Sequence, residues 1–266
     1  MTTPRCFIIR HGETEWSLSG KHTGNSDIPL TANGEKRVRA TGKALVGDDR
    51  LIVPKQLKHI YVSPMQRSQR TMELLNLGSP PPYPWQDPSS ATPRNGTFTN
   101  PTRHTDAKIT VTDKIREWDY GDYEGITSKE IKKQRADAGM DTWDIWRDGC
   151  PGGESPEDVI KRVDELISEI RTQHHEPYIA KEESEDQCSG DVVVVAHGHI
   201  LRAFAMRWIE KPLSETRFIM EAGGVGTLSY EHKNIEEPAI LLGGGFVVGK
   251  DVAEEIEEEA KEGKLK

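Results

Sequence analysis

The chain has 266 residues, with 35 Lys and Arg against 44 Asp and Glu, and its formal net charge is −9. This acidic balance argues against a general nucleic-acid-binding protein, although a local arginine cluster could still bind a phosphorylated small molecule. No stretch approaches the roughly 18 apolar residues of a membrane span, and the first residues do not resemble a signal peptide, so we expect neither a nucleic-acid nor a membrane partner.

The first predicted element is a buried strand, because the apolar run at residues 7–9 is continuous and ends abruptly in Arg10-His11-Gly12. In open α/β sheets, ligands bind beyond the carboxyl ends of such strands. We therefore expect Arg10 and His11 to lie at the mouth of a site. The loop over residues 13–30 is expected to line that site, and its candidate residues are Trp16, Ser17, Lys21, His22, Thr23 and Gly24.

A helix and a strand follow this loop. Thr31 is a candidate N-cap for a helix that reaches about Val46. Residues 59–62 have the pattern of a short strand and run directly into Ser63-Pro64-Met65-Gln66. That tetrapeptide combines a capping serine, a proline at the first helical position and a capping-box glutamine, so it predicts a second helix.

This second helix would begin at the carboxyl end of a strand, which points its free N–H groups toward the site. Arg67 lies one turn in and is expected to reach a phosphate, whereas Arg70 is expected on a solvated helix face. Residues 76–106 then carry seven prolines among many Ser, Thr and Asn residues. They predict a long insertion loop, to which we assign no chemistry.

A strand is predicted to resume at residues 109–111. The segment 115–125 that follows combines four acidic and three aromatic residues. One of its carboxylates could serve as a general acid, and a charged surface loop is the alternative.

The wider segment 113–155 is expected to form a lid over the site. Its capping box Thr127-Ser128-Lys129-Glu130 predicts a helix to about Ala138. Glycines at its end would let the segment move.

The clearest helix begins at Ser155-Pro156, where a core stripe repeats at helical spacing: Val159, Val163, Leu166, Ile167 and Ile170. Residues 173–190 are polar and acidic, and they predict an exposed connection.

A second buried strand over residues 191–196 then ends in His197-Gly198-His199. One isolated His-Gly would be an ordinary turn, but two strands that each end in His-Gly predict that two imidazoles meet at one sheet edge. The remaining predicted elements are a helix at 200–208, a hairpin of residues 227–230 and 239–242, and a charged tail at 251–266 after a single domain over residues 1–250.

Together these motifs resemble those of the histidine phosphatase superfamily, also called phosphoglycerate-mutase-like. Four motifs appear in the family's order: Arg10-His11-Gly12-Glu13-Thr14, Ser63-Pro64 with Arg67, Arg116-Glu117 with Tyr120-Gly121 and Glu124-Gly125, and Ala196-His197-Gly198-His199. The resemblance covers about residues 5–242 and implies an α/β fold, a three-layer α/β/α sandwich with a mostly parallel central sheet. Further details, such as Trp146-Arg147-Asp148-Gly149-Cys150, look closer still to the sedoheptulose-1,7-bisphosphatases of that superfamily.

The resemblance also implies a chemistry. His11 would be the nucleophile that forms a phosphohistidine, and Glu117 would protonate the leaving alkoxide and then deprotonate the attacking water. Arg10, Arg67 and His197 would bind the phosphoryl oxygens, so that neither a metal ion nor another cofactor is expected. The expected substrate-binding residues are Ser17, Thr23, Gly24, Trp118, Tyr120, Arg147, Gly198 and His199.

The expected substrate is a phosphorylated sugar, and the resemblance favours conversion of sedoheptulose 1,7-bisphosphate to sedoheptulose 7-phosphate. A bisphosphate needs a second anion site several ångströms from His11. The sequence offers five candidates without choosing among them: Lys21, His22, Arg116, Lys129 and Arg147.

Other functions stay open. A broad-range phosphatase or a phosphoglycerate mutase would share the pocket, although Ser17 and His199 stand where mutases usually carry Asn. A metallohydrolase could use His197 and His199, but no further ligands accompany them at metal spacing. A non-enzymatic module that binds phosphorylated ligands would not need a nucleophile and an acid.

The three scattered cysteines predict no disulfide framework and hence a cytoplasmic location. Whether the chain forms a homo-oligomer is left open.

Overall fold

A computed structural model of the chain describes residues 3–86, 103–179 and 189–242. Its centre is a six-stranded sheet in the order β3-β2-β4-β1-β5-β6. The strands are β1 Cys6–Arg10, β2 Leu57–Val62, β3 Lys108–Val111, β4 Asp191–Ala196, β5 Val225–Tyr230 and β6 Pro238–Leu241. Strands β3, β2, β4 and β1 run parallel, whereas β5 and β6 are antiparallel additions at one edge. The predicted mostly parallel sheet is confirmed.

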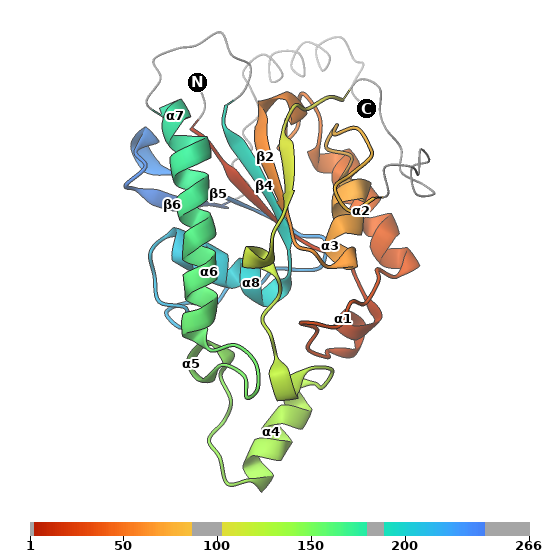
Figure 1. Ribbon diagram of the computed structural model, residues 1–266, viewed down its shortest axis with the longest axis vertical. Coiled ribbons are helices and arrows are strands. Elements are labelled where there is room, and N and C mark those ends of the chain that lie inside the picture. The colour runs from red at the N-terminus through yellow and green to blue at the C-terminus, as the bar shows by residue number, and fades with distance from the viewer. Residues whose placement is uncertain (1–2, 87–102, 180–188, 243–266) are drawn as a thin grey trace, which may run out of the picture.

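Helices cover both faces of this sheet. Helices α2 (Ala32–Leu45) and α3 (Gln66–Leu75) lie on one face, and α6 (Pro156–Glu169) and α8 (Gly198–Trp208) lie on the other (Figure 1). Alternate residues of a strand point to opposite faces, so Phe7 and Ile9 pack into the core under α2 and α3, while Cys6 and Ile8 pack into the core under α6 and α8. Burial on both faces explains the uninterrupted apolar runs of β1 and β4 and confirms the three-layer α/β/α sandwich.

The short elements connect these layers. Two of them are helices of one turn or slightly more, α1 (Glu15–Ser19) and α5 (Ile145–Asp148), and a longer helix, α4 (Ser128–Asp137), projects at the lower end of the view in Figure 1. The 3₁₀ turns are η1 Pro54–Gln56, η2 Asp113–Ile115, η3 Gly121–Tyr123 and η5 Glu231–Lys233. No helix within the described residues is long and apolar enough to cross a bilayer.

Several predicted helix starts are confirmed by their caps. The Thr31 side chain accepts a hydrogen bond from the backbone of Gly34 at the start of α2. Reciprocal capping boxes open α4 at Thr127 and α6 at Ser155. The apolar stripe predicted for α6 is buried, and the late hairpin forms as β5 and β6.

Two predictions about helix α3 were wrong. Helix α3 begins after Met65, and its first backbone N–H, that of Gln66, donates to the Asp27 side chain across the fold. Ser63 therefore does not cap this helix, and its hydroxyl instead contacts His197. Arg70 is not solvated, because its guanidinium donates to the carboxylates of Glu35 and Glu73.

Residues 173–179 are not an exposed connection. They continue α6 through a π-helical turn, η4 (Ile170–His175), into α7 (Glu176–Ile179). His174 and His175 are buried there, and the Nδ1 atom of His175 is hydrogen-bonded to the Tyr230 hydroxyl at 2.8 Å. Polar residue types predicted exposure, but these two imidazoles find partners inside the core.

The parts of residues 76–106 that the structure describes contain neither helix nor strand, as predicted for a loop. Residues 87–102 of that loop and the predicted tail at 251–266 lie outside the described residues. Within 113–155, four of the five aromatic side chains (Trp118, Tyr120, Tyr123 and Trp143) are buried in the core on the α6 and α8 side, and Trp146 is partly buried against it. The segment is therefore anchored by its aromatic residues, and its motion as a lid stays a prediction.

Candidate active site

A pocket of about 180 Å³ opens beyond the carboxyl ends of β1 and β4. This is the sheet edge at which parallel strands present their following residues. The pocket is lined by Arg10, His11, Thr14, Ser17, Gly20, Lys21, His22, Thr23, Glu117, Tyr120, Gly198, His199, Arg202 and Met220. These residues come from three separate segments, 10–23, 117–120 and 198–220, so only the fold brings them together.

His11 lies at the base of this pocket and is 5% exposed. Its Nδ1 atom is 2.7 Å from the carbonyl oxygen of Gly12. A carbonyl can only accept, so Nδ1 carries the proton and Nε2 keeps a free lone pair. Burial, followed by the charges of Arg67 and Arg10, lowers the pKa of His11 well below its usual value. The imidazole is therefore neutral at pH 7 and held in the tautomer that a nucleophile needs.

The glycine after His11 is required by close packing. A Cβ atom at Gly12 would lie 2.7 Å from Val38 Cγ2 and 3.2 Å from the Gly34 carbonyl of helix α2. The backbone N–H of Gly12 also donates to the Thr71 hydroxyl at 3.0 Å. Helices α2 and α3 thus fix the position of His11.

Arg10 is fixed by the loop before β5. Its Nη1 donates to the Met220 carbonyl at 2.6 Å, and its backbone exchanges hydrogen bonds with Gly223 and Gly224. Its buried Nε has no hydrogen-bond partner among the described residues. Arg10 also lines the pocket, so its guanidinium places a fixed positive charge beside it, which favours an anion.

His197 and Arg67 contact each other directly. The Nε of Arg67 donates to Nδ1 of His197 at 3.0 Å, and Nε2 of His197 lies 2.7 Å from the Ser63 hydroxyl. The rings of His197 and His11 are 5.1 Å apart, so the two His-Gly turns do bring two imidazoles together. Both ring nitrogens of His197 have protein partners here, and both residues lie behind the residues that line the pocket.

Glu117 lies over the amino end of α8. Its Oε1 accepts hydrogen bonds from the backbone N–H groups of Trp118 and Ile200, both at 2.9 Å, and its Oε2 accepts from His199 at 3.0 Å. These three N–H donors fix the direction of the carboxyl group at the amino end of α8. The carboxyl is 7% exposed and faces the pocket.

The predicted substrate-binding residues divide into two groups. Ser17, Thr23, Tyr120, Gly198 and His199 line the pocket, and the Tyr120 hydroxyl is 2.7 Å from Nδ1 of His199. The other three lie outside it. Gly24 and Trp118 are buried in the fold, and Trp118 donates from its indole to the Glu154 carbonyl. Arg147 is exposed on α5 and pairs with Asp148.

Of the five candidates for a second anion site, Lys21 and His22 line the pocket, whereas Arg116, Lys129 and Arg147 lie outside it. Burial lowers the pKa of His22 to about 4, so at pH 7 this imidazole offers hydrogen bonds and no charge.

Sequence reasoning missed Arg202. It lies on α8, four residues after Gly198, and therefore faces the same side of the helix as the end of the second His-Gly motif. Its guanidinium stacks on the Trp146 ring at 4.8 Å, and its buried Nε has no hydrogen-bond partner among the described residues. Helical spacing from Gly198 would have been enough to identify it.

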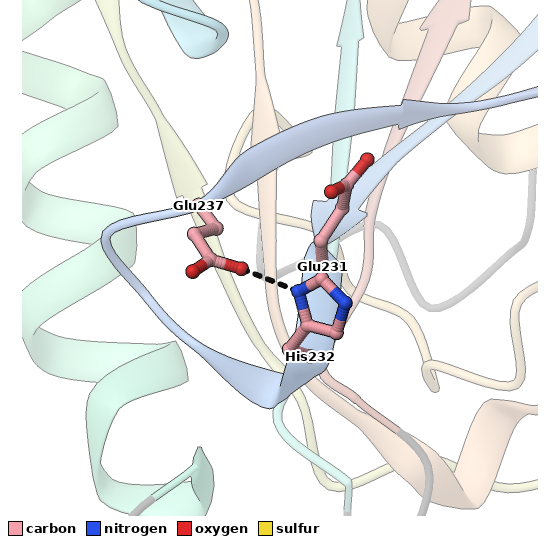
Figure 2. Close-up of side chains that lie close together, drawn as sticks. All are labelled: Glu231, His232 and Glu237. Atoms are coloured by element: carbon pink, nitrogen blue, oxygen red, sulfur yellow. Dashed lines mark hydrogen bonds and ion pairs between the residues drawn. The ribbon is translucent and has the colours of Figure 1, made fainter.

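Metal-ligating side chains cluster elsewhere. Within the described residues, the one group with metal-ligand spacing is Glu231, His232 and Glu237 at the exposed turn between β5 and β6 (Figure 2). His232 Nδ1 lies 2.7 Å from Oε2 of Glu237. At the end of β4, the Nδ1 atoms of His197 and His199 contact Arg67 and Tyr120 respectively, so they do not converge on a common point.

Paired histidines, a buried carboxylate and arginines at one edge of a mostly parallel sheet are the groups of an enzyme that binds phosphoryl groups. Residues 6–87 and 89–239 match the family model of the histidine phosphatase superfamily (branch 1). The chain belongs to this superfamily, and its relatives include phosphatases.

Several relatives are similar over nearly their full length. The chain is 35% identical to the sedoheptulose 1,7-bisphosphatase of Saccharomyces cerevisiae, over 92% of this chain and 94% of that protein. It is 31% identical to an acid phosphatase of Mycobacterium tuberculosis, over 89% of this chain and 91% of that protein. The solved structure of a functionally characterised M. tuberculosis open reading frame matches with a TM-score of 0.62 and 27% identity, over 91% of this chain and 97% of that one.

Proposed function

We propose that this enzyme is a metal-independent phosphatase that hydrolyses sugar bisphosphates through a phosphohistidine on His11. The observation that carries the proposal is the hydrogen bond from Nδ1 of His11 to the Gly12 carbonyl. It leaves the lone pair of Nε2 free for attack. Phosphoryl transfer depends mainly on positioning and charge stabilisation, and the pocket supplies both.

The reaction has two steps. In the first, Nε2 of His11 attacks phosphorus, the bond between phosphorus and the sugar oxygen breaks, and protonated Glu117 gives its proton to the leaving alkoxide. In the second, Glu117 takes a proton from a water molecule whose oxygen attacks the phosphohistidine. Inorganic phosphate leaves, and both His11 and Glu117 return to their starting states.

We assign different roles to the two arginines, although the sequence predicts that both bind the phosphoryl oxygens. Arg67 makes four hydrogen bonds to protein atoms, those of His197, Ser26, Thr23 and Gly24. We therefore assign it mainly to holding His197 and to supplying positive charge. Arg10 lines the pocket, whereas Arg67 does not, so Arg10 is the stronger candidate for direct contact with the transferring phosphoryl group.

A second phosphate would bind at Arg202 and Lys21. Both line the pocket, and both side chains carry a positive charge. With His22 and His199 as hydrogen-bonding neighbours, this half of the pocket can take a second anion. It supports sedoheptulose 1,7-bisphosphate as the substrate, which is also the compound named for the similar yeast enzyme. Broad-range hydrolysis of phosphate monoesters is the second candidate, favoured by the similarity to an acid phosphatase.

The test is phosphate release in EDTA with sedoheptulose 1,7-bisphosphate, fructose 1,6-bisphosphate, 3-phosphoglycerate and an aryl phosphate. We expect a kcat/KM at least about tenfold higher for the seven-carbon bisphosphate. Equal values would favour the broad-range enzyme. His11→Ala should abolish turnover of all substrates while the melting temperature stays near that of the wild type. Unchanged hydrolysis by His11→Ala, or loss of activity in EDTA, would refute the mechanism.

A further inference from the structure

Glu124 is a half-buried carboxylate that the proposed mechanism does not use. Its Oε2 and Oε1 accept hydrogen bonds from the backbone N–H of Gly24, at 2.9 and 3.1 Å, and Oε1 also accepts from Ser26 at 2.9 Å. Both donors belong to one short loop, residues 23–26. Charged acceptors make stronger hydrogen bonds than neutral ones, so Glu124 holds this loop by its N–H groups.

Arg67 holds the same loop by its carbonyl groups. Its Nη1 donates to Ser26 at 2.8 Å, and its Nη2 donates to Thr23 and Gly24, both at 3.1 Å. The loop is therefore held from two sides: the Glu124 carboxylate accepts from its backbone N–H groups, and the Arg67 guanidinium donates to its carbonyl groups. Burial lowers the pKa of Arg67, and the carboxylates of Glu117, Asp27 and Glu124 oppose that shift.

The loop has little freedom to move within this arrangement. A Cβ atom at Gly24 would lie 2.4 Å from the Trp118 carbonyl oxygen and 3.0 Å from Oε2 of Glu124. Only glycine brings the backbone this close to the acidic segment. The position of the loop is thus set jointly by Glu124 and by the backbone beside Glu117.

The position of Arg67 in turn determines a hydrogen bond to His197. With its Nη groups on the loop, Arg67 directs Nε to Nδ1 of His197 at 3.0 Å. The Nε of arginine is only a donor, so Nδ1 of His197 must accept, and the ring proton is on Nε2. That proton is donated to the Ser63 hydroxyl at 2.7 Å.

From these contacts we infer that Glu124 is a positioning residue, which fixes the orientation and tautomer of His197 through the loop at 23–26 and Arg67. It touches neither His197 nor the pocket residues that would meet the phosphoryl group. The effect on turnover rests on the proposed function, because His197 matters for catalysis only if phosphoryl transfer occurs beside it.

Glu124→Gln tests this inference with a small change of shape. Glutamine keeps one acceptor oxygen, but its NH₂ group would face a backbone N–H of the loop. Glu130→Gln is the matched control, because Glu130 lies in the same segment and accepts from the backbone N–H and the hydroxyl of Thr127 at the start of α4, outside the pocket. Both variants lose hydrogen bonds to a carboxylate, and only the first is connected to Arg67.

We expect Glu124→Gln to lower kcat by about tenfold or more, with KM changed less, and Glu130→Gln to leave kcat within about twofold. In an Arg67→Lys background, Glu124→Gln should add less than about twofold, because both residues act through one loop. The ¹⁵N signals of the His197 ring should show one tautomer, protonated at Nε2, in the wild type and a mixture in Glu124→Gln.

If the decreases in kcat caused by Glu124→Gln and Arg67→Lys multiply in the double variant, the inference is overturned. An unchanged His197 tautomer in Glu124→Gln would also overturn it. A wild-type enzyme without phosphatase activity would refute the proposed function instead. The NMR comparison needs no turnover, so it would still decide the role of Glu124.

Discussion

The Oε1 atom of Glu117 lies 2.9 Å from the backbone nitrogen of Ile200 in the first turn of α8. A carboxyl group from the middle of the chain is thereby fixed at the end of the helix that follows the second His-Gly turn. The helix dipole and three N–H donors orient Glu117 toward the pocket that holds His11.

Glu117→Gln should lower kcat by about 10²- to 10⁴-fold, the usual contribution of a general acid and base. The amide keeps the size of the side chain but cannot transfer a proton. Steady-state kinetics on the bisphosphate would measure the effect, with the melting temperature as a control for folding. A variant that keeps wild-type kcat would show that another group transfers the proton.

His11 should remain neutral well below pH 6.5. Its folded-state pKa is lowered, first by burial and then by Arg67 and Arg10, so the nucleophilic form is lost only when the pH falls through that lower value. An NMR titration of the His11 ring from pH 8 to pH 4 measures this directly, without interference from the phosphate ester, which itself titrates near pH 6. A midpoint near 6.5 would contradict the buried, cation-flanked site.

Arg202→Gln should lower kcat/KM for sedoheptulose 1,7-bisphosphate by about tenfold or more, because an arginine that binds a phosphate contributes a strong charge-assisted hydrogen bond. Hydrolysis of an aryl phosphate, which has no second phosphate, should change by less than about twofold. Arg147→Gln is the matched control, since Arg147 pairs with Asp148 outside the pocket. Equal losses on both substrates would remove Arg202 from the second site.

Two buried histidines far from the pocket should make stability depend on pH. Burial lowers the pKa of His175 to about 3 and that of His59 to about 4. The folded state therefore favours their neutral forms, and the stability they provide is present above pH 6.5 and lost as the pH falls toward the folded-state values. Each unit by which folding lowers the pKa of a histidine corresponds to at most about 1.4 kcal/mol of this stability.

Melting temperatures at pH 7 and pH 5 would check this. The difference between them should shrink in His175→Phe, although the Tyr230 hydroxyl then loses its hydrogen bond to His175 and overall stability falls. His232→Gln is the control. The hydrogen bond to Glu237 raises the pKa of this exposed histidine (Figure 2), so its small contribution is present at low pH and lost as the pH rises. An unchanged difference in His175→Phe would refute the linkage.

Much of the fold could be predicted from local chemistry. Continuous apolar runs gave β1 and β4, capping residues gave the starts of α2, α4 and α6, and spacing gave the buried stripe of α6. Each of these depends on residues within a few positions of one another. Local chemistry failed where a residue distant in the sequence determines the contact. Ser63 is a residue type that often caps helices, but its hydroxyl contacts His197 instead. His175 is polar, but it is buried against Tyr230.

The sequence by itself determined the chemical groups of the site, because two buried strands that each end in His-Gly must present those imidazoles at a sheet edge. Only the tertiary structure decided which cations meet the pocket. Arg147 and Arg202 are the same residue type, but Arg147 lies exposed on α5 beside Asp148, whereas Arg202 lies on α8 facing the pocket with a buried, unpaired Nε. Charge and length alone do not distinguish the two, since the direction of a side chain is set by the packing of the helix that carries it.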